Sequence, residues 1–196
     1  MKSLLICAGA LISASLMFAQ DSTIDTNAFG LSPKFTETKV FNGATISIAY
    51  ASPSVKGLAG KIFTQDGLVG SGKDIPASRV PDGTFPVWRA GDGSATMFHT
   101  DADLDLGGLA VPRGDYTLYM DISNADGWQL IVNKELHQWG LTYNPPQDLG
   151  RVKANMSKPP ALVENLKYTI TDLGGNKGRI ELAWENKVAS VDFTVK

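Results

Sequence analysis

The fold is indicated by a stretch near the end of the chain, residues 179–184, which reads Arg-Ile-Glu-Leu-Ala-Trp. Apolar side chains at every second position are typical of a half-buried β-strand, because successive side chains point to opposite faces of a sheet. Ile180, Leu182 and Trp184 would therefore face a core, while their neighbours would face solvent.

The same two-residue alternation recurs through most of the chain. It is present in residues 45–50, 101–106, 116–120, 128–133, 166–171 and 191–195. Turns rich in glycine, proline and asparagine separate these runs. No apolar stripe of helical period persists over a dozen residues. We therefore expect an all-β protein, a single antiparallel β-sandwich of jelly-roll-like type, with a partly closed β-barrel as the second choice.

The first residues are typical of a secretory signal peptide. Lys2 supplies a positive charge, and Leu4 to Ala19 is uncharged and shorter than the roughly 20 apolar residues that span a bilayer. We expect a signal peptide over 1–19, a flexible lead-in over 20–35 and one domain over 36–196. The only cysteine, Cys7, belongs to the leader, so the mature chain would lack disulfides and thiolate sites.

Charge narrows the range of partners. After removal of the leader, 17 basic residues face 20 acidic ones, a net charge of −3. No basic patch stands out, which argues against nucleic acid as a partner. No later apolar run is long enough to span a membrane. We expect a periplasmic or secreted protein without a cofactor, and the sequence gives no indication of its oligomeric state.

Residues 58–86 differ from the rest of the chain. They are rich in Gly, Ser, Pro and Asp and show little alternation. Long loops inside compact domains are often functional or disordered. Because this loop leads into Trp88, it could form a flap over whatever Trp88 lines, and a tolerated surface insertion is the other interpretation.

A series of motifs also appears in a fixed order. They are Ser52-Pro53-Ser54-Val55-Lys56-Gly57, Lys61-Ile62-Phe63, Val87-Trp88-Arg89-Ala90-Gly91, Val111-Pro112-Arg113-Gly114-Asp115-Tyr116, Trp128-Gln129-Leu130-Ile131-Val132-Asn133-Lys134, Gln138-Trp139-Gly140 and Asp148-Leu149-Gly150-Arg151-Val152. Together they resemble the bacterial secreted family known as domain of unknown function 2911, over about residues 40–195. The resemblance implies a β-rich exported domain and no established activity. The chain departs from the family in a longer connection between residues 63 and 87, and in Gly93-Ser94, where relatives tend to have Asn-Glu.

Histidine chemistry rests on His99 and His137. His99 and Asp101 are two residues apart and would share a strand face, so they could form a histidine–carboxylate pair. Such a pair could serve a hydrolase-type enzyme that uses His99 with Asp101 or His137. An assisting metal would need a third ligand, such as His137 or Asp92. The spacing of the two histidines is not that of a known metal motif, and structural histidines are the alternative.

Three aspartates, Asp101, Asp103 and Asp105, resemble the opening of a calcium loop. That loop needs glycine at its sixth position and a bidentate acid at its twelfth, where this chain has Leu106 and Pro112. We therefore expect a solvated carboxylate stripe on one strand face rather than a bound metal.

Aromatic and amide side chains form the strongest binding candidates. Trp88, Arg89, Gln138 and Trp139 combine aromatic planes with hydrogen-bond donors, a combination suited to sugars, peptides or carboxylated ligands. The leading hypothesis is a non-catalytic envelope domain that binds a small molecule, a glycan or a partner protein. The alternatives are the hydrolase described above and a purely structural envelope protein.

Overall fold

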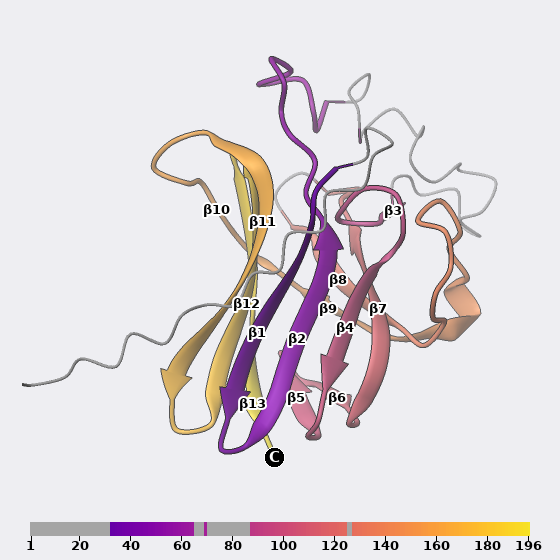
Figure 1. Cartoon of the computed structure of the whole chain (residues 1–196), viewed down its shortest axis with the longest axis vertical. Coiled ribbons are helices and arrows are strands. Elements are labelled where there is room, and N and C mark those ends of the chain that lie inside the picture. Colours follow the sequence, from indigo (N-terminus) through magenta and orange to yellow (C-terminus); the bar gives the residue numbers. More distant parts are fainter. Residues whose placement is uncertain (1–31, 65–68, 70–86, 125–126) are drawn as a thin grey trace, which may run out of the picture.

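The computed structural model describes residues 32–64, 69, 87–124 and 127–196. Its strands form two antiparallel sheets that pack face to face, which confirms the expected β-sandwich (Figure 1). The sheets remain separate, so the partly closed barrel is not the architecture. The predicted signal peptide, most of the lead-in and most of the loop over 58–86 lie outside the described residues. The first strand begins at Lys34, two residues before the expected start of the domain.

Among the described residues, the first sheet contains seven strands. In spatial order they are β1 (Lys34–Phe41), β2 (Ala44–Ala51), β4 (Thr96–Thr100), β7 (Gly114–Asp121), β8 (Gln129–Asn133) and β9 (Asp148–Lys153), and the short β3 (Val87–Trp88) pairs with the end of β7. The pairing of β3 with β7 holds the Trp88 backbone at one end of this sheet.

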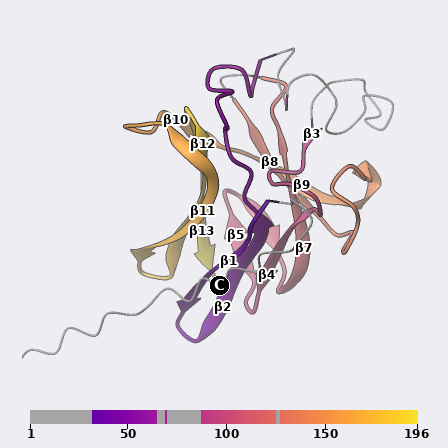
Figure 2. The ribbon, with the colours of Figure 1, turned by 45° about the horizontal axis from the view of Figure 1, so that its top comes forward.

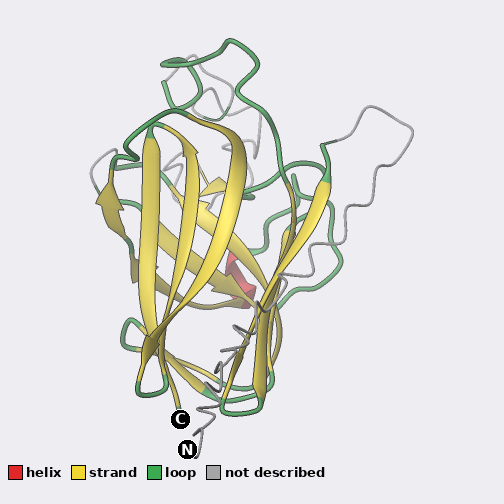
Figure 3. Cartoon of the chain, turned by 60° about the vertical axis from the view of Figure 1, so that its left-hand side comes forward, coloured by secondary structure: helices red, strands yellow, loops and turns green. Residues whose placement is uncertain are grey.

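The second sheet contains six strands. In order they are β11 (Val163–Gly174), β12 (Lys177–Glu185), β13 (Lys187–Val195), β5 (Leu104–Leu106) and β6 (Leu109–Val111), with β10 (Asn155–Ser157) pairing with β13. Figure 2 and Figure 3 show the two layers from other sides. The 3₁₀ helix η2 (Pro145–Gln147) lies before β9. No helix within the described ranges is both long and apolar enough to cross a membrane.

The core lies between the sheets and follows the alternation of the sequence. Ile46 and Ile48 of β2 are fully buried against Ile180 and Leu182 of the opposite sheet's β12, as members of one cluster. Burial of such aliphatic side chains contributes roughly 1.5–3 kcal/mol each. The alternation therefore identified which face of β2, β11, β12 and β13 points inward.

One end of the core is aromatic. Trp88 of β3 stacks on Trp184 of β12, with ring centroids 5.7 Å apart and planes 19° apart. Phe63 contacts both rings, and it also contacts Trp128 at 4.9 Å. Phe63 and the buried Ile62 belong to the 58–86 segment, for which a flap over Trp88 and a tolerated surface insertion were the two interpretations. Its described part thus contributes directly to the core.

A second apolar cluster lies on the outer face of the first sheet. It consists of Val87, Ala95, Tyr119, Ile131 and Tyr143. Tyr119 and Ile131 occupy the outward phase of β7 and β8, where alternation predicts exposure, yet both are fully buried. Residues 134–147, which we call the covering segment, carry Tyr143 across this face and exclude solvent from it.

Candidate functional site

The turn that follows β3 is organised around one ion pair. Arg89 lies 3.6 Å from Asp92, measured from Nη2 to Oδ1, and its Nη1 donates to the carbonyl oxygen of Gly93 at 3.1 Å. Asp92 also accepts from the hydroxyl of Ser32 at 2.7 Å and from the backbone N–H of Gly93 at 2.8 Å. Only 14% of the Arg89 side chain is exposed. The guanidinium therefore fixes the turn.

The covering segment docks against this turn. Ser94 and Trp139 form an isolated antiparallel bridge, and the N–H of Gly140 donates to the carbonyl of Gly93 at 3.1 Å. A Cβ at position 140 would collide with Arg89 Cδ and with the Gly93 carbonyl oxygen. Glycine is required there because the two backbones and the arginine approach so closely. The fold thus brings Arg89, Trp139 and their neighbours together.

Gln138 points inward rather than toward a ligand. Its Nε2 donates to the hydroxyl of Tyr119 at 2.9 Å, and that hydroxyl donates to the Thr142 carbonyl at 2.6 Å. Burial raises the pKa of Tyr119 to about 12, so the hydroxyl remains a donor at physiological pH. Trp139, in contrast, is 55% exposed. These two neighbours in the sequence have opposite environments.

Trp88 is a core residue with one edge on a cavity. It is 2% exposed and packs within the aromatic end of the core. A cavity of about 330 Å³, here called the end cavity, lies beside it. Its wall is formed by Ser32, Pro53, Ser54, Lys56, Leu58, Val69, Trp88, Arg89, Gly91, Asp92 and Trp184. Two of the four predicted binding residues, Trp88 and Arg89, line this cavity, whereas Gln138 and Trp139 do not.

The indole N–H of Trp184, a residue in the wall of the end cavity, lacks a partner within the described ranges. Trp184 is 2% exposed, and its Nε1 N–H has no hydrogen-bond acceptor among the described residues. A buried donor without an acceptor costs about 1–3 kcal/mol, so most native proteins avoid it. The sequence placed Trp184 in the core correctly but gave no sign of this unpaired donor.

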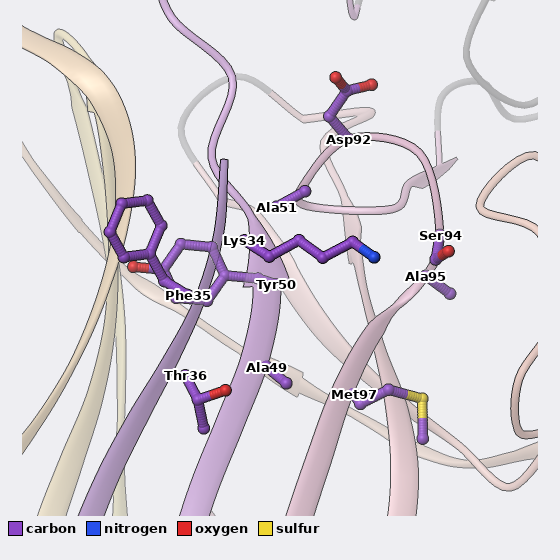
Figure 4. A pocket seen from close by; sticks show the side chains of 10 residues that line it. All are labelled: Lys34, Phe35, Thr36, Ala49, Tyr50, Ala51, Asp92, Ser94, Ala95 and Met97. Carbon is purple, nitrogen blue, oxygen red and sulfur yellow. The ribbon is translucent and has the colours of Figure 1, made fainter. Parts of the chain in front are cut away.

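A second hollow, the outer groove, lies on the other side of the turn (Figure 4). It has a volume of about 330 Å³ and is lined by Lys34, Phe35, Thr36, Ala49, Tyr50, Ala51, Asp92, Ser94, Ala95 and Met97. Figure 4 shows Lys34 extended across the face of β2 toward β4. Asp92 lines both hollows, so it forms part of the wall between them.

His99 lies on the outer face of the first sheet, far along the strands from the turn. Its Nδ1 is 2.8 Å from Asp115 Oδ1, and its Nε2 is 3.0 Å from Asp101 Oδ1. Two carboxylates can be satisfied together only when both ring nitrogens carry protons. The pKa of His99 is raised by the hydrogen bond that its ring donates to Asp115, which has the larger effect, and by the one that it donates to Asp101. The predicted pair with Asp101 is present, and Asp115 is an additional partner.

This arrangement superficially resembles a Ser-His-Asp triad. Ser47, His99 and Asp115 lie in one row across β2, β4 and β7. In a triad the Nε2 of the histidine removes the serine proton. Here Nε2 is bonded to Asp101, and among the described residues no hydrogen bond joins Ser47 to His99. An imidazolium held by two carboxylates has no free lone pair with which to act as a general base.

The remaining candidates do not converge with His99. His137 is exposed in the covering segment, has φ of 63° and forms no ion pair or hydrogen bond within the described part of the chain. Asp101 accepts from the N–H of Thr45, Asp103 from that of Arg113, and Asp105 from that of Gly108.

The aspartates form only part of the expected stripe. Leu104 and Leu106 are buried as predicted, but β5 begins at Leu104, so Asp101 and Asp103 precede the strand. Within the described ranges, no group of three histidine, cysteine or acidic side chains is placed to hold a metal ion. Each aspartate instead accepts a hydrogen bond from a backbone N–H, that of Thr45 in β2 for Asp101, that of Arg113 for Asp103 and that of the turn residue Gly108 for Asp105.

Comparison with known proteins supports the resemblance of the motifs. Residues 32–193 match a protein family described as "Protein of unknown function (DUF2911)". The chain belongs to this family. No curated protein and no solved structure shows a significant match to it. Membership of the DUF2911 family therefore brings no activity, ligand or partner with it.

Sequence reasoning did not anticipate the positions of three residues in this DUF2911 chain. Lys56 lines the end cavity, as does Asp92, which was considered only as a metal ligand, and Asp115 binds His99. Asp115 could have been found from the strand register, because β4 and β7 place it opposite His99. The other two depend on how loops fold over the end of the sandwich, which alternation does not specify.

Proposed function

We propose that this domain is a ligand-binding module and that its site is the end cavity. The observation that carries the proposal is a cavity wall that contains Trp184, a residue whose buried Nε1 N–H has no acceptor within the described part of the chain. A ligand in the cavity could supply that acceptor. A pocket with aromatic walls and a few polar groups is typical of small-molecule sites.

Size supports a small ligand. The end cavity, at about 330 Å³, lies at the lower limit of the roughly 300–1,000 Å³ range of ligand pockets. Its apolar wall includes Trp88, Leu58 and Val69. In this proposal Trp88 provides a contact edge and Arg89 keeps the wall rigid, because the guanidinium is already bonded to Asp92 and Gly93.

The outer groove and the exposed Trp139 are the alternative binding places, and the structure gives less support for a ligand there than in the end cavity. The groove contains no buried unpaired donor or acceptor within the described residues. Trp139 alone offers one aromatic plane. A glycan or a partner protein bound at Trp139 is therefore the competing form of the binding hypothesis.

The test uses the four tryptophans as separate reporters. In ¹⁵N-labelled protein each indole N–H gives one cross-peak, which single Trp→Phe variants assign. A fragment library of several chemical classes is then added. We expect hits that move the Trp184 and Trp88 cross-peaks and leave the Trp139 peak in place. Hits that move only Trp139, or a library in which nothing moves Trp184, would contradict the proposal.

Export is a separate part of the proposal. It rests on the positive Lys2, the uncharged run to Ala19 and the polar segment that follows. Expression of the full chain in a bacterium should yield a shortened protein in the periplasm or medium, whose N-terminus lies close to residue 20. Full-length protein retained in the cytoplasm would rule this out.

A further inference from the structure

The covering segment has unfavourable local features in its closed position. Glu135 Oε2 and Gln138 Oε1 are buried acceptor atoms without a donor among the described residues. His137, which lies between them in the chain, has φ of 63°, a left-handed conformation that residues other than glycine rarely adopt. If the segment moved away from the sheet, the two acceptors would gain water and His137 could relax. These features therefore favour an open position of the segment.

Apolar contacts beneath the segment oppose that opening. The segment covers the second apolar cluster, in which Tyr119, Ile131 and Tyr143 are buried. This cluster is separate from the main core between the two sheets. Because the two sets of apolar contacts are separate, the segment can open while the sandwich stays folded.

The turn that lines the end cavity shares its bonds with the covering segment. The carbonyl of Gly93 accepts from the guanidinium of Arg89 and from the N–H of Gly140, each at 3.1 Å. Gly140 lies so close to Arg89 that a Cβ at position 140 would overlap with Arg89 Cδ. The N–H of Ala95 donates to the carbonyl of Gln138 at 3.5 Å. Opening of the segment would therefore remove both backbone bonds and the contact that confines Arg89.

The turn, residues 89–95, is itself held in a strained conformation. Ala90 has φ of 52° and is fully buried. Its carbonyl accepts from the hydroxyls of Thr96 at 3.1 Å and Tyr168 at 3.2 Å. Strained backbone persists only where the surrounding contacts fix it, and the covering segment supplies part of those contacts. Loss of the segment should therefore alter the turn and, with it, the wall of the end cavity.

We infer that the covering segment and this turn open together, as one unit of the folded protein, and that this opening regulates the end cavity. In the closed state the segment holds Arg89 in place and supports the wall. In the open state the wall loses that support. A ligand that contacts the wall favours the closed state by its difference in affinity for the two states. The regulatory role rests on the proposed function, whereas the coupled opening does not.

Native-state hydrogen exchange of the wild-type protein measures the opening directly. The reporters are hydrogen-bonded backbone N–H groups in the segment and in the turn, those of Gly140, Thr142, Gly93 and Ala95. We expect these groups to have similar protection factors, well below that of Leu182 in the central strand β12. Their exchange should depend only weakly on urea, because the opening exposes little of the protein's surface.

Two conservative variants test the coupling from opposite sides. Tyr119→Phe removes a hydroxyl that bonds to the segment, and Tyr119 does not line the end cavity. It should speed exchange in the turn by about as much as in the segment, roughly tenfold for a lost hydrogen bond. Asp92→Asn removes the ion-pair partner of Arg89 in the turn and should speed exchange in the segment severalfold. Tyr116→Phe is the control and should leave both unchanged, because its hydroxyl donates to Pro112.

Three results would overturn the coupled opening. Exchange of Gly140 as slow as that of Leu182 would mean that the segment opens only when the whole sandwich unfolds. A Tyr119→Phe effect confined to the segment would mean that the turn opens independently. An Asp92→Asn effect confined to the turn would mean the same.

The regulatory role has a readout of its own. A fragment that shifts the Trp184 peak, added at about one hundred times its Kd, should slow the exchange of Gly140 by about a hundredfold if it binds only the closed state. Unchanged exchange would overturn the regulatory role and leave the cavity as a binding site. A library without such a fragment would contradict the proposed function, and with it the regulatory role, but not the coupled opening.

Discussion

His99 connects three strands through two carboxylates, and its charge should make the stability depend on pH. Asp115 and Asp101 raise the pKa of His99 above its usual 6.5. The folded protein then binds a proton more tightly than the unfolded chain does. The stabilisation is fully present below about pH 6.5 and is lost as the pH rises through the higher pKa of the folded state.

We therefore expect the urea midpoint of the wild type to fall as the pH rises above 6.5 and through the raised pKa of His99 in the folded state. The His99→Gln variant should lack this part of the fall. The change should be small, because the side chain is 39% exposed and solvent screens exposed pairs. Asp115→Asn, which removes the first of the two causes, should also flatten the profile. Identical slopes in wild type and His99→Gln would refute the assignment.

The close approach of two backbones at Gly140 predicts that any side chain there destabilises the protein. A methyl group there would collide with Arg89 Cδ and with the Gly93 carbonyl, and backbone cannot move aside as easily as a side chain. Gly140→Ala should destabilise the protein by roughly 1–3 kcal/mol, the usual cost of overpacking. Gly127→Ala is the matched control, since its nearest neighbour is the end of the Asn124 side chain at 3.3 Å. Urea unfolding of both variants measures the difference, and equal stability would show that the turn yields easily.

At the scale of elements, the covering segment is held at both ends by polar contacts. Asn133 donates to the Asn144 carbonyl at 3.0 Å and to Asp148 at 2.8 Å. At its far end, Tyr143 donates to Asp148 at 2.6 Å and accepts from Arg151 at 2.8 Å. The middle is fastened by the Tyr119 hydroxyl. The segment therefore depends on a few bonds rather than on a strand ladder.

Removal of the central bond should loosen the segment locally. In Tyr119→Phe the Gln138 amide loses an acceptor and the Thr142 carbonyl loses a donor. We expect faster hydrogen exchange over residues 134–147, and a cost of about 1–3 kcal/mol. Tyr116→Phe is the control, because its hydroxyl donates to Pro112 in another part of the sheet. Unchanged exchange in 134–147 would show that apolar contacts alone hold the segment.

The same segment shows how far alternation could predict this structure. The inward faces of β2, β11, β12 and β13 were predicted because each strand has one apolar face and one polar face. Tyr119 and Ile131 fall in the outward phase, and only the irregular chain over them explains their burial. A covering loop has no periodicity, so the sequence alone does not reveal it.

The candidate site, too, was predictable in its residue types but not in its three-dimensional arrangement. Sequence patterns selected Trp88 and Arg89, because aromatic and cationic side chains stand together there, and both line the end cavity. They also selected Trp139, but the exposure of Trp139 and the burial of Trp184 Nε1 without an acceptor among the described residues are tertiary properties. Composition indicated the kind of site but not this unpaired donor.

For the whole molecule, the aromatic end of the core should determine whether the two sheets unfold together. Trp128 precedes β8 of the first sheet, and through Phe63 it contacts Trp184 of the second. Trp128→Ala removes a side chain that is 2% exposed and does not line the end cavity. The expected cost is roughly 3–5 kcal/mol, as for other buried aromatic truncations.

Because the cluster joins both sheets, this loss should appear as one cooperative transition at lower urea, with coincident curves from far-ultraviolet circular dichroism and tryptophan fluorescence. Trp139→Ala is the control, since that side chain is 55% exposed, and its stability should stay within about 0.5 kcal/mol of wild type. Two separated transitions in Trp128→Ala would mean that each sheet retains structure alone. If Trp128→Ala lowers the free energy of unfolding by less than a surface substitution does, Phe63 and Trp88 must fill the space that Trp128 leaves. This end of the core would then be loosely packed.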